Sequence, residues 1–123
     1  MPELPEVETI KRELTPLVRG QKIATAKVLW PKTVTPTSPR RFQNILRGQT
    51  ITTIDRRAKI LLLELAGGQT LAIHLKMTGQ LIYRDTDNEV VGGHPQVGGT
   101  NNLPNRFTRL ILTFEHGGQL FFN

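Results

Sequence analysis

The chain has 123 residues and no cysteine, and its 16 Lys and Arg against 10 Asp and Glu give a formal net charge of +6. This length predicts one domain, and the absence of cysteine excludes a disulfide framework and a cysteine-ligated zinc site. No apolar run approaches the ~20 residues of a membrane span and no signal peptide is evident, so we expect a soluble, cytoplasmic protein whose positive charge favours a nucleic-acid partner.

Two helices are expected in the first half of the chain. The first is predicted over residues 5–19, because apolar side chains recur there at helical spacing: Val7, Ile10, Leu14 and Leu17. Gly20 follows it as a plausible C-terminal cap. Ser38-Pro39 is typical of a helix cap and first residue, and it predicts a short second helix that ends at residue 46.

Short strands separated by glycine turns make up most of the remaining sequence. They are predicted at residues 22–30, 50–56, 58–66, 69–75, 80–83, 107–115 and 119–122. Residues 84–106 contain two glycine pairs and an asparagine pair, and are expected to form a loop. Short strands with flanking helices indicate a mainly β fold, either a β-sandwich or a barrel-like sheet, with no second domain.

The first residues carry an unusual grouping of reactive groups. Removal of Met1 exposes the secondary amine of Pro2, and an α-amino group titrates near ~8, so a fraction is neutral and nucleophilic. Such an amine can form a Schiff base, and Glu3 beside it can serve as a general acid or base. Glu6 and Glu8 suit the start of a helix, and a helix terminus with favourable charges is the alternative interpretation.

Three cations fall within the stretch Arg56-Arg57-Ala58-Lys59. Arg57 and Lys59 have the same parity, so on one strand they would point to the same face and could neutralise phosphates. A strand edge guarded by charge is an equally open interpretation.

His74 and Met77 lie at the end of an apolar strand. A single histidine on a strand is more often structural than functional, and an apolar residue at a strand exit usually belongs to the core. His94 and His116 do not join His74 at the spacing of metal ligands, so we expect no metal site in this chain.

The string Pro2-Glu3-Leu4-Pro5-Glu6-Val7-Glu8-Thr9 resembles the amino terminus of formamidopyrimidine-DNA glycosylases, the Fpg/Nei family. Three later stretches resemble the same family: residues 56–59, residues 73–81 and the closing hairpin. The resemblance implies a two-layer β-sandwich with an N-terminal amphipathic helix and a second short helix. Residues 1–123 would then form the N-terminal catalytic domain of a bifunctional DNA glycosylase and AP lyase.

The resemblance also implies a mechanism and its residues. The Pro2 nitrogen would attack the anomeric carbon of an everted lesion nucleotide while Glu3 supplies a proton that helps open the sugar ring. The base leaves, and the resulting Schiff base allows both flanking phosphates to depart by β,δ-elimination. The family assigns Lys59 to a phosphate beside the lesion and to proton donation in the elimination, and Glu6 is expected to support these groups.

For DNA binding, the resemblance places Lys59 and His74 on backbone phosphates. It makes Met77 a wedge that fills the gap left by the everted nucleotide, which is the usual logic of base flipping. The expected partner is double-stranded DNA that contains oxidised purines, such as 8-oxoguanine and formamidopyrimidines, or abasic sites, bound by a monomer. Phe107 stands where many family members have a DNA-contacting histidine.

The family's helix–two-turn–helix and zinc-finger segments are absent from this chain. No cofactor is therefore expected here, and zinc is expected only in the zinc finger of a full-length protein. Two other interpretations remain open: a catalytically inactive DNA-binding module of the same fold, and a generic basic β-domain that binds protein or RNA.

Overall fold

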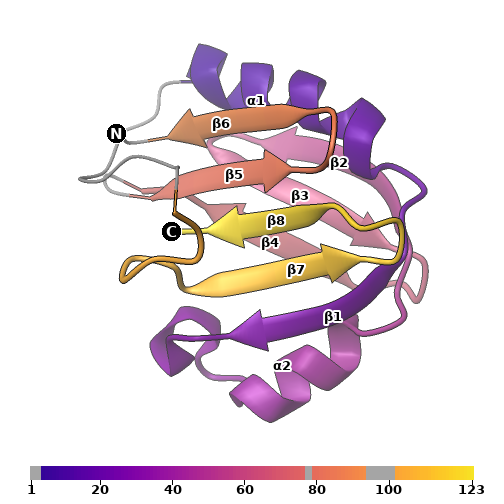
Figure 1. The fold of residues 1–123 in the computed structure, drawn as a ribbon, viewed down its shortest axis with the longest axis vertical. Coiled ribbons are helices and arrows are strands. Elements are labelled where there is room, and N and C mark those ends of the chain that lie inside the picture. The colour runs from indigo at the N-terminus through magenta and orange to yellow at the C-terminus, as the bar shows by residue number, and fades with distance from the viewer. Residues whose placement is uncertain (1–3, 77–78, 94–101) are drawn as a thin grey trace.

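The computed structural model describes residues 4–76, 79–93 and 102–123, which form two antiparallel sheets packed face to face (Figure 1). One sheet has five strands in the order β1-β7-β8-β5-β6, and the other has three in the order β2-β3-β4. The strands are β1 (Ile23–Val28), β2 (Ile51–Arg57), β3 (Ile60–Leu65), β4 (Thr70–His74), β5 (Gln80–Arg84), β6 (Glu89–Gly93), β7 (Leu110–Phe114) and β8 (Gln119–Phe122). This two-layer β-sandwich confirms the predicted fold class.

Helix α1 (Leu4–Val18) covers the edge of the sandwich where β6 and β2 meet (Figure 1). Its predicted apolar stripe is buried at Val7, Ile10 and Leu14. The helix lies so close to β6 that a Cβ atom at Gly92 would collide with the Ile10 side chain. Burial of this stripe, rather than intrinsic helix propensity, holds α1 against the sheets.

The second helix, α2 (Pro39–Leu46), covers the opposite edge beside β1 (Figure 1). Its predicted cap is confirmed, because Ser38 Oγ accepts a hydrogen bond from the Arg41 backbone N–H at 3.2 Å. From the helix, Gln43 Oε1 accepts from the Val28 backbone N–H at 2.8 Å, which satisfies a donor of the edge strand β1. A single turn of 3₁₀ helix, η1 (Pro31–Val34), lies between β1 and α2.

Two predictions for the second half of the chain are wrong. Residues 89–93 were expected in a loop, but they form β6 because Val90 is buried opposite Tyr83 and Gly92 gives room to α1. β7 begins at residue 110 rather than 107. The preceding residues form a turn in which Asn105 Oδ1 accepts from the Phe107 backbone N–H at 2.9 Å.

The apolar core lies between the two sheets and under α1. Its largest fully buried side chains include Tyr83 and Phe114, whose ring centroids lie 6.4 Å apart. Both sheets and both helices therefore pack on one core, and the candidate site lies at one side of the sandwich.

Within the described ranges, no helix is both long and apolar enough to span a membrane.

Candidate active site

The beginning of α1, the end of β6 and the start of β5 lie at the same side of the sandwich (Figure 1). Glu6 Oε1 accepts a hydrogen bond from the Gly93 backbone N–H at 2.9 Å. Gly93 has a φ of 102°, and a Cβ there would collide with the Gly79 carbonyl oxygen. These close approaches of backbone require glycine, and they join α1 to the segment that enters β5.

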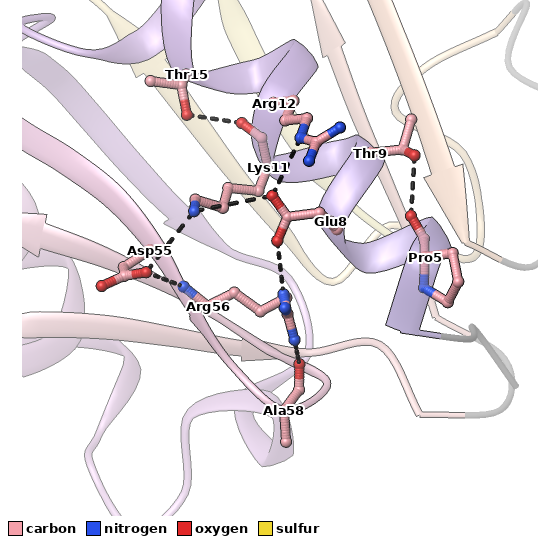
Figure 2. Close-up of polar contacts among 9 residues, drawn as sticks. All are labelled: Pro5, Glu8, Thr9, Lys11, Arg12, Thr15, Asp55, Arg56 and Ala58. Carbon is pink, nitrogen blue, oxygen red and sulfur yellow. Dashed lines mark hydrogen bonds and ion pairs between the residues drawn. The ribbon is translucent and has the colours of Figure 1, made fainter.

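The Glu8 carboxylate ties α1 to β2 and to the turn that follows it (Figure 2). Glu8 Oε1 accepts from Arg56 Nε at 2.9 Å, and Arg56 Nη1 donates to the Ala58 carbonyl oxygen at 2.9 Å. Lys11 Nζ lies between Glu8 and Asp55, at 3.9 and 3.8 Å. The Arg56 guanidinium holds the pKa of Glu8 below its ordinary value, so this carboxylate stays charged.

Lys59 lies in the tight turn between β2 and β3 rather than on a strand. β2 ends at Arg57, Ala58 takes a left-handed conformation with a φ of 51°, and β3 begins at Ile60. The prediction that Arg57 and Lys59 share one strand face is therefore wrong, because the chain reverses between them. Arg56 was expected to neutralise a phosphate, but its guanidinium donates hydrogen bonds to Glu8 and to the Ala58 carbonyl oxygen.

The strand register brings the turn next to His74. Arg57 pairs with Ile60 across β2 and β3, and Ile60 pairs with His74 across β3 and β4. Arg57, Lys59 and His74 thus lie at the same end of the three-stranded sheet, although up to 17 positions separate them in the sequence. The sequence predicted a phosphate contact for each of these residues separately, and the strand register brings them to the same end of the sheet.

His74 is held in one orientation by the backbone that follows it. Its Nδ1 accepts a hydrogen bond from the Lys76 backbone N–H at 2.9 Å, and Lys76 has a φ of 56°. Because Nδ1 accepts, the proton of the neutral imidazole lies on Nε2, which is then a donor for an anionic oxygen. The Gly79 backbone N–H donates to the Leu75 carbonyl oxygen at 2.7 Å and draws the two ends of the connection together.

Of the other two histidines, His94 lies outside the described residues, whereas His116 has local partners, as does Phe107. His116 lies in the β7–β8 turn, with Nε2 2.9 Å from the Tyr83 hydroxyl, which donates to Asp85 at 2.6 Å. The Arg106 guanidinium stacks 4.9 Å from the Phe107 ring centroid. In the part of the chain that the structure describes, no three His, Asp or Glu side chains are placed to hold a metal ion.

The family model for the formamidopyrimidine-DNA glycosylase N-terminal domain matches residues 1–123, the whole chain. The chain belongs to this family. Among curated members, it is 51% identical over 85 residues to the formamidopyrimidine-DNA glycosylase of Moorella thermoacetica, covering 69% of this chain and 31% of that protein. It is 42% identical over 124 residues to that of Chloroflexus aurantiacus, covering 100% of this chain and 39% of the relative.

Solved structures of the same family share the fold. Lactococcus lactis Fpg (MutM) in complex with a Fapy-dG containing DNA superposes with a TM-score of 0.76 at 32% identity, covering 98% of this chain and 39% of that one. The same protein bound non-covalently to an AP-site containing DNA gives a TM-score of 0.76 at 32% identity and covers 98% of this chain and 40% of that one. The chain therefore spans well under half the length of the relatives it matches.

The predicted site residues divide into two groups. Pro2, Glu3 and Met77 lie outside the described residues. Glu6, Lys59 and His74 are described, and all three lie where elements end or turn at one edge of the sandwich. The Glu8–Arg56 pair was not predicted, because no short motif relates two residues that are 48 positions apart.

Proposed function

We propose that the chain is the DNA-binding, catalytic domain of a DNA glycosylase with AP lyase activity that excises oxidised purines, including 8-oxoguanine and formamidopyrimidines. The observation that carries the proposal is the family match over residues 1–123. Support comes from one side of the sandwich, where Glu6 lies at the start of α1, Lys59 in the β2–β3 turn and His74 at the end of β4. Damaged DNA in the complexes of Lactococcus lactis Fpg also supports this substrate class.

In the proposed mechanism, the Pro2 nitrogen attacks the anomeric carbon of the everted nucleotide. The bond from that carbon to the base breaks, and the base departs with the bonding electrons and takes up the proton that the amine loses. Glu3 gives a proton to the ring oxygen as the sugar opens. The iminium that remains acidifies the neighbouring carbon, so the two flanking phosphates leave in successive eliminations. Lys59 contacts a phosphate beside the lesion and donates a proton in the elimination.

The described residues would position these groups. Glu6 is bound to the backbone of Gly93, so we assign it no proton transfer and propose that it anchors the start of α1. Arg56 joins Glu8 to the turn that carries Lys59. His74 would donate from Nε2 to a backbone phosphate, in the orientation that its bond from Lys76 selects.

The amine is tested by borohydride trapping on abasic DNA. The chain is prepared with Met1 removed, as checked by intact mass, and extended by the C-terminal part of the Chloroflexus aurantiacus relative; we refer to this as the extended protein. We expect a covalent adduct, a strong reduction in Pro2→Gly and none when one residue is added before Pro2. Undiminished trapping with a blocked terminus would contradict the role of Pro2. DNA binding without trapping would identify an inactive binding module.

The wedge is tested with two DNA substrates. Met77→Ala should impair excision of a paired oxidised purine more than reaction at a preformed abasic site, because eversion of a paired base costs a few kcal/mol. Equal losses on both substrates would instead indicate a structural role for Met77.

We further propose that the 123-residue chain folds alone as a monomer but has little excision activity. Its core is complete around both sheets. Orientation of the reacting groups can supply ~7–11 kcal/mol of barrier reduction, and one wall of a cleft supplies only part of it. A cooperative thermal transition with almost no excision of 8-oxoguanine is expected. Full turnover by this chain, in a preparation free of host glycosylase, would contradict the second statement.

A further inference from the structure

A cavity of about 460 Å³ opens between the two sheets beside η1, on the side of the sandwich away from α1. Its floor is apolar, with Phe42, Leu71 and Leu110 among its lining residues. Its ionisable lining side chains are all basic, and they come from three separate stretches of the chain: Lys32, His74 with Lys76, and Arg109. Described acidic side chains do not contribute to the lining, so the cavity favours an anionic occupant.

Arg109 and two aromatic rings form one wall of the cavity. The Arg109 guanidinium carbon lies 5.2 Å from the Trp30 ring centroid and 5.7 Å from that of Phe122. Trp30 is nevertheless 44% exposed, so part of its ring is accessible to a ligand. Arg109 Nε has no hydrogen-bond partner among the described residues, so the aromatic contacts orient the guanidinium without using this donor.

The basic groups of the cavity differ from those around α1 in their partners. Lys32, Lys76 and Arg109 form no ion pair with any described acidic residue. A cluster of cations without carboxylates repels itself, and binding of phosphates relieves that repulsion while releasing counterions from DNA.

We propose that this cavity binds the sugar–phosphate backbone of the DNA strand as it runs on from His74 towards η1. Lys32, Lys76 and Arg109 neutralise phosphates, and the exposed face of Trp30 contacts deoxyribose or a base edge. The position follows from His74, which lines the cavity and also belongs to the candidate active site. This assignment rests on the proposed function and extends the DNA interface to η1 and the residues before β7, beyond Lys59, His74 and Met77.

Trp30 is the only tryptophan of the chain, so tryptophan fluorescence reports on this cavity alone. The 123-residue chain is titrated with a labelled duplex that carries an abasic-site analogue. Label anisotropy measures DNA binding, and Trp30 emission measures occupancy of the cavity. We expect both signals to change with the same midpoint and to weaken together as the salt concentration rises.

Lys32→Gln tests the charge, with Lys27→Gln as the matched control. Lys27 lies on β1, is exposed and does not line the cavity. Lys32→Gln should reduce the magnitude of the log–log salt slope by about 0.9, the expectation for one lost phosphate contact. Lys27→Gln should leave it unchanged, and Lys76→Gln should repeat the effect of Lys32→Gln from a different element.

The outcomes separate this inference from the proposed function. DNA binding by anisotropy with constant Trp30 emission, and with Lys32→Gln equal to Lys27→Gln, would overturn the cavity assignment and leave the proposed function intact. Absence of DNA binding by the extended protein would overturn the proposed function itself. A poly-glutamate peptide that changed Trp30 emission at the same concentrations as DNA would indicate an acidic protein partner and overturn the assignment to DNA.

Discussion

The basic residues beside α1 and those beside η1 differ in whether they are paired with carboxylates. Beside α1, the cations Lys11, Arg12 and Arg56 all lie within 4 Å of the Glu8 carboxylate. Beside η1, Lys32 and Arg109 have no acidic partner among the described residues. The first group uses charge to hold elements of the protein together, and the second leaves charge available for a ligand.

This difference indicates that the number of basic residues in a stretch of sequence does not predict which of them are available to bind nucleic acid. Arg56 and Lys59 belong to the same basic stretch, but Arg56 is bound to Glu8 and to the Ala58 carbonyl. Lys32 and Arg109 stand in segments with little concentration of charge, and the fold brings them to one cavity. Mutations in the two groups should therefore change different observables.

The largest effect is expected from Arg56→Gln in the extended protein. The substitution removes the tie between α1 and the turn that carries Lys59, and misplacement of reacting groups by ~1 Å can cost ~10²-fold in rate. We expect a loss of up to this size in the trapping rate on abasic DNA, with a smaller change in DNA affinity. Arg12→Gln is the control, because Arg12 meets the same carboxylate but its side chain is 77% exposed. Equal effects of the two variants would contradict a positioning role for Arg56.

The next largest effect, a loss of stability, is expected from Gly79→Ala, which lies in the connection from β4 to β5. A Cβ at this position would collide with the Leu75 backbone, so the connection from β4 to β5 must shift. Overpacking of this kind costs about 1–3 kcal/mol of unfolding free energy. Denaturant titration should show this loss, and Gly117→Ala provides a comparison at a turn where a positive φ, but no collision, opposes the substitution.

A smaller effect is expected from Tyr83→Phe at the far end of the sandwich. The Tyr83 hydroxyl donates to Asp85 and contacts His116, and burial of the ring raises the pKa of Tyr83, so the hydroxyl stays protonated. Its loss should lower the Tm by a few degrees. DNA affinity and the trapping rate should remain those of the unchanged protein at temperatures well below Tm. A large loss of either would show that the far end contributes to the site.

The smallest effect is a pH dependence of stability below the neutral range. The Arg56 guanidinium lowers the pKa of Glu8, and the Tyr83 hydroxyl lowers that of Asp85. A carboxylate with a depressed folded pKa stabilises the protein at pH above its unfolded pKa, about 4, and loses this contribution as pH falls through the folded value. Thermal scans from pH 6 to pH 2 should therefore show a declining Tm, with a shallower decline in Arg56→Gln.

The regular elements could largely be predicted from the sequence, because they follow from local patterns. The α1 stripe at Val7, Ile10 and Leu14 has helical spacing, and Ser38-Pro39 is a local cap signal. β6 was missed because Gly92 and Gly93 favour a loop by composition, whereas the structure uses Gly92 to let Ile10 approach.

The arrangement of the candidate site could be predicted only in part. A family resemblance named Lys59 and His74, but the turn at Ala58 and the bond that orients the imidazole depend on backbone geometry. The Glu8–Arg56 pair and the approach of Arg109 to Trp30 join distant parts of the chain. Such contacts are set by tertiary packing, which no local window of sequence contains.

The hydrogen bond from Gly93 to Glu6 has a consequence for how the domain is made. It joins residues 87 positions apart, so it closes one of the longest loops in the chain and bears the high entropic cost of such closures. During synthesis the amino terminus emerges first, and its anchor on β6 emerges only after most of the domain. The start of α1 is therefore anchored late, because a nascent chain cannot form this bond before β6 has been synthesised.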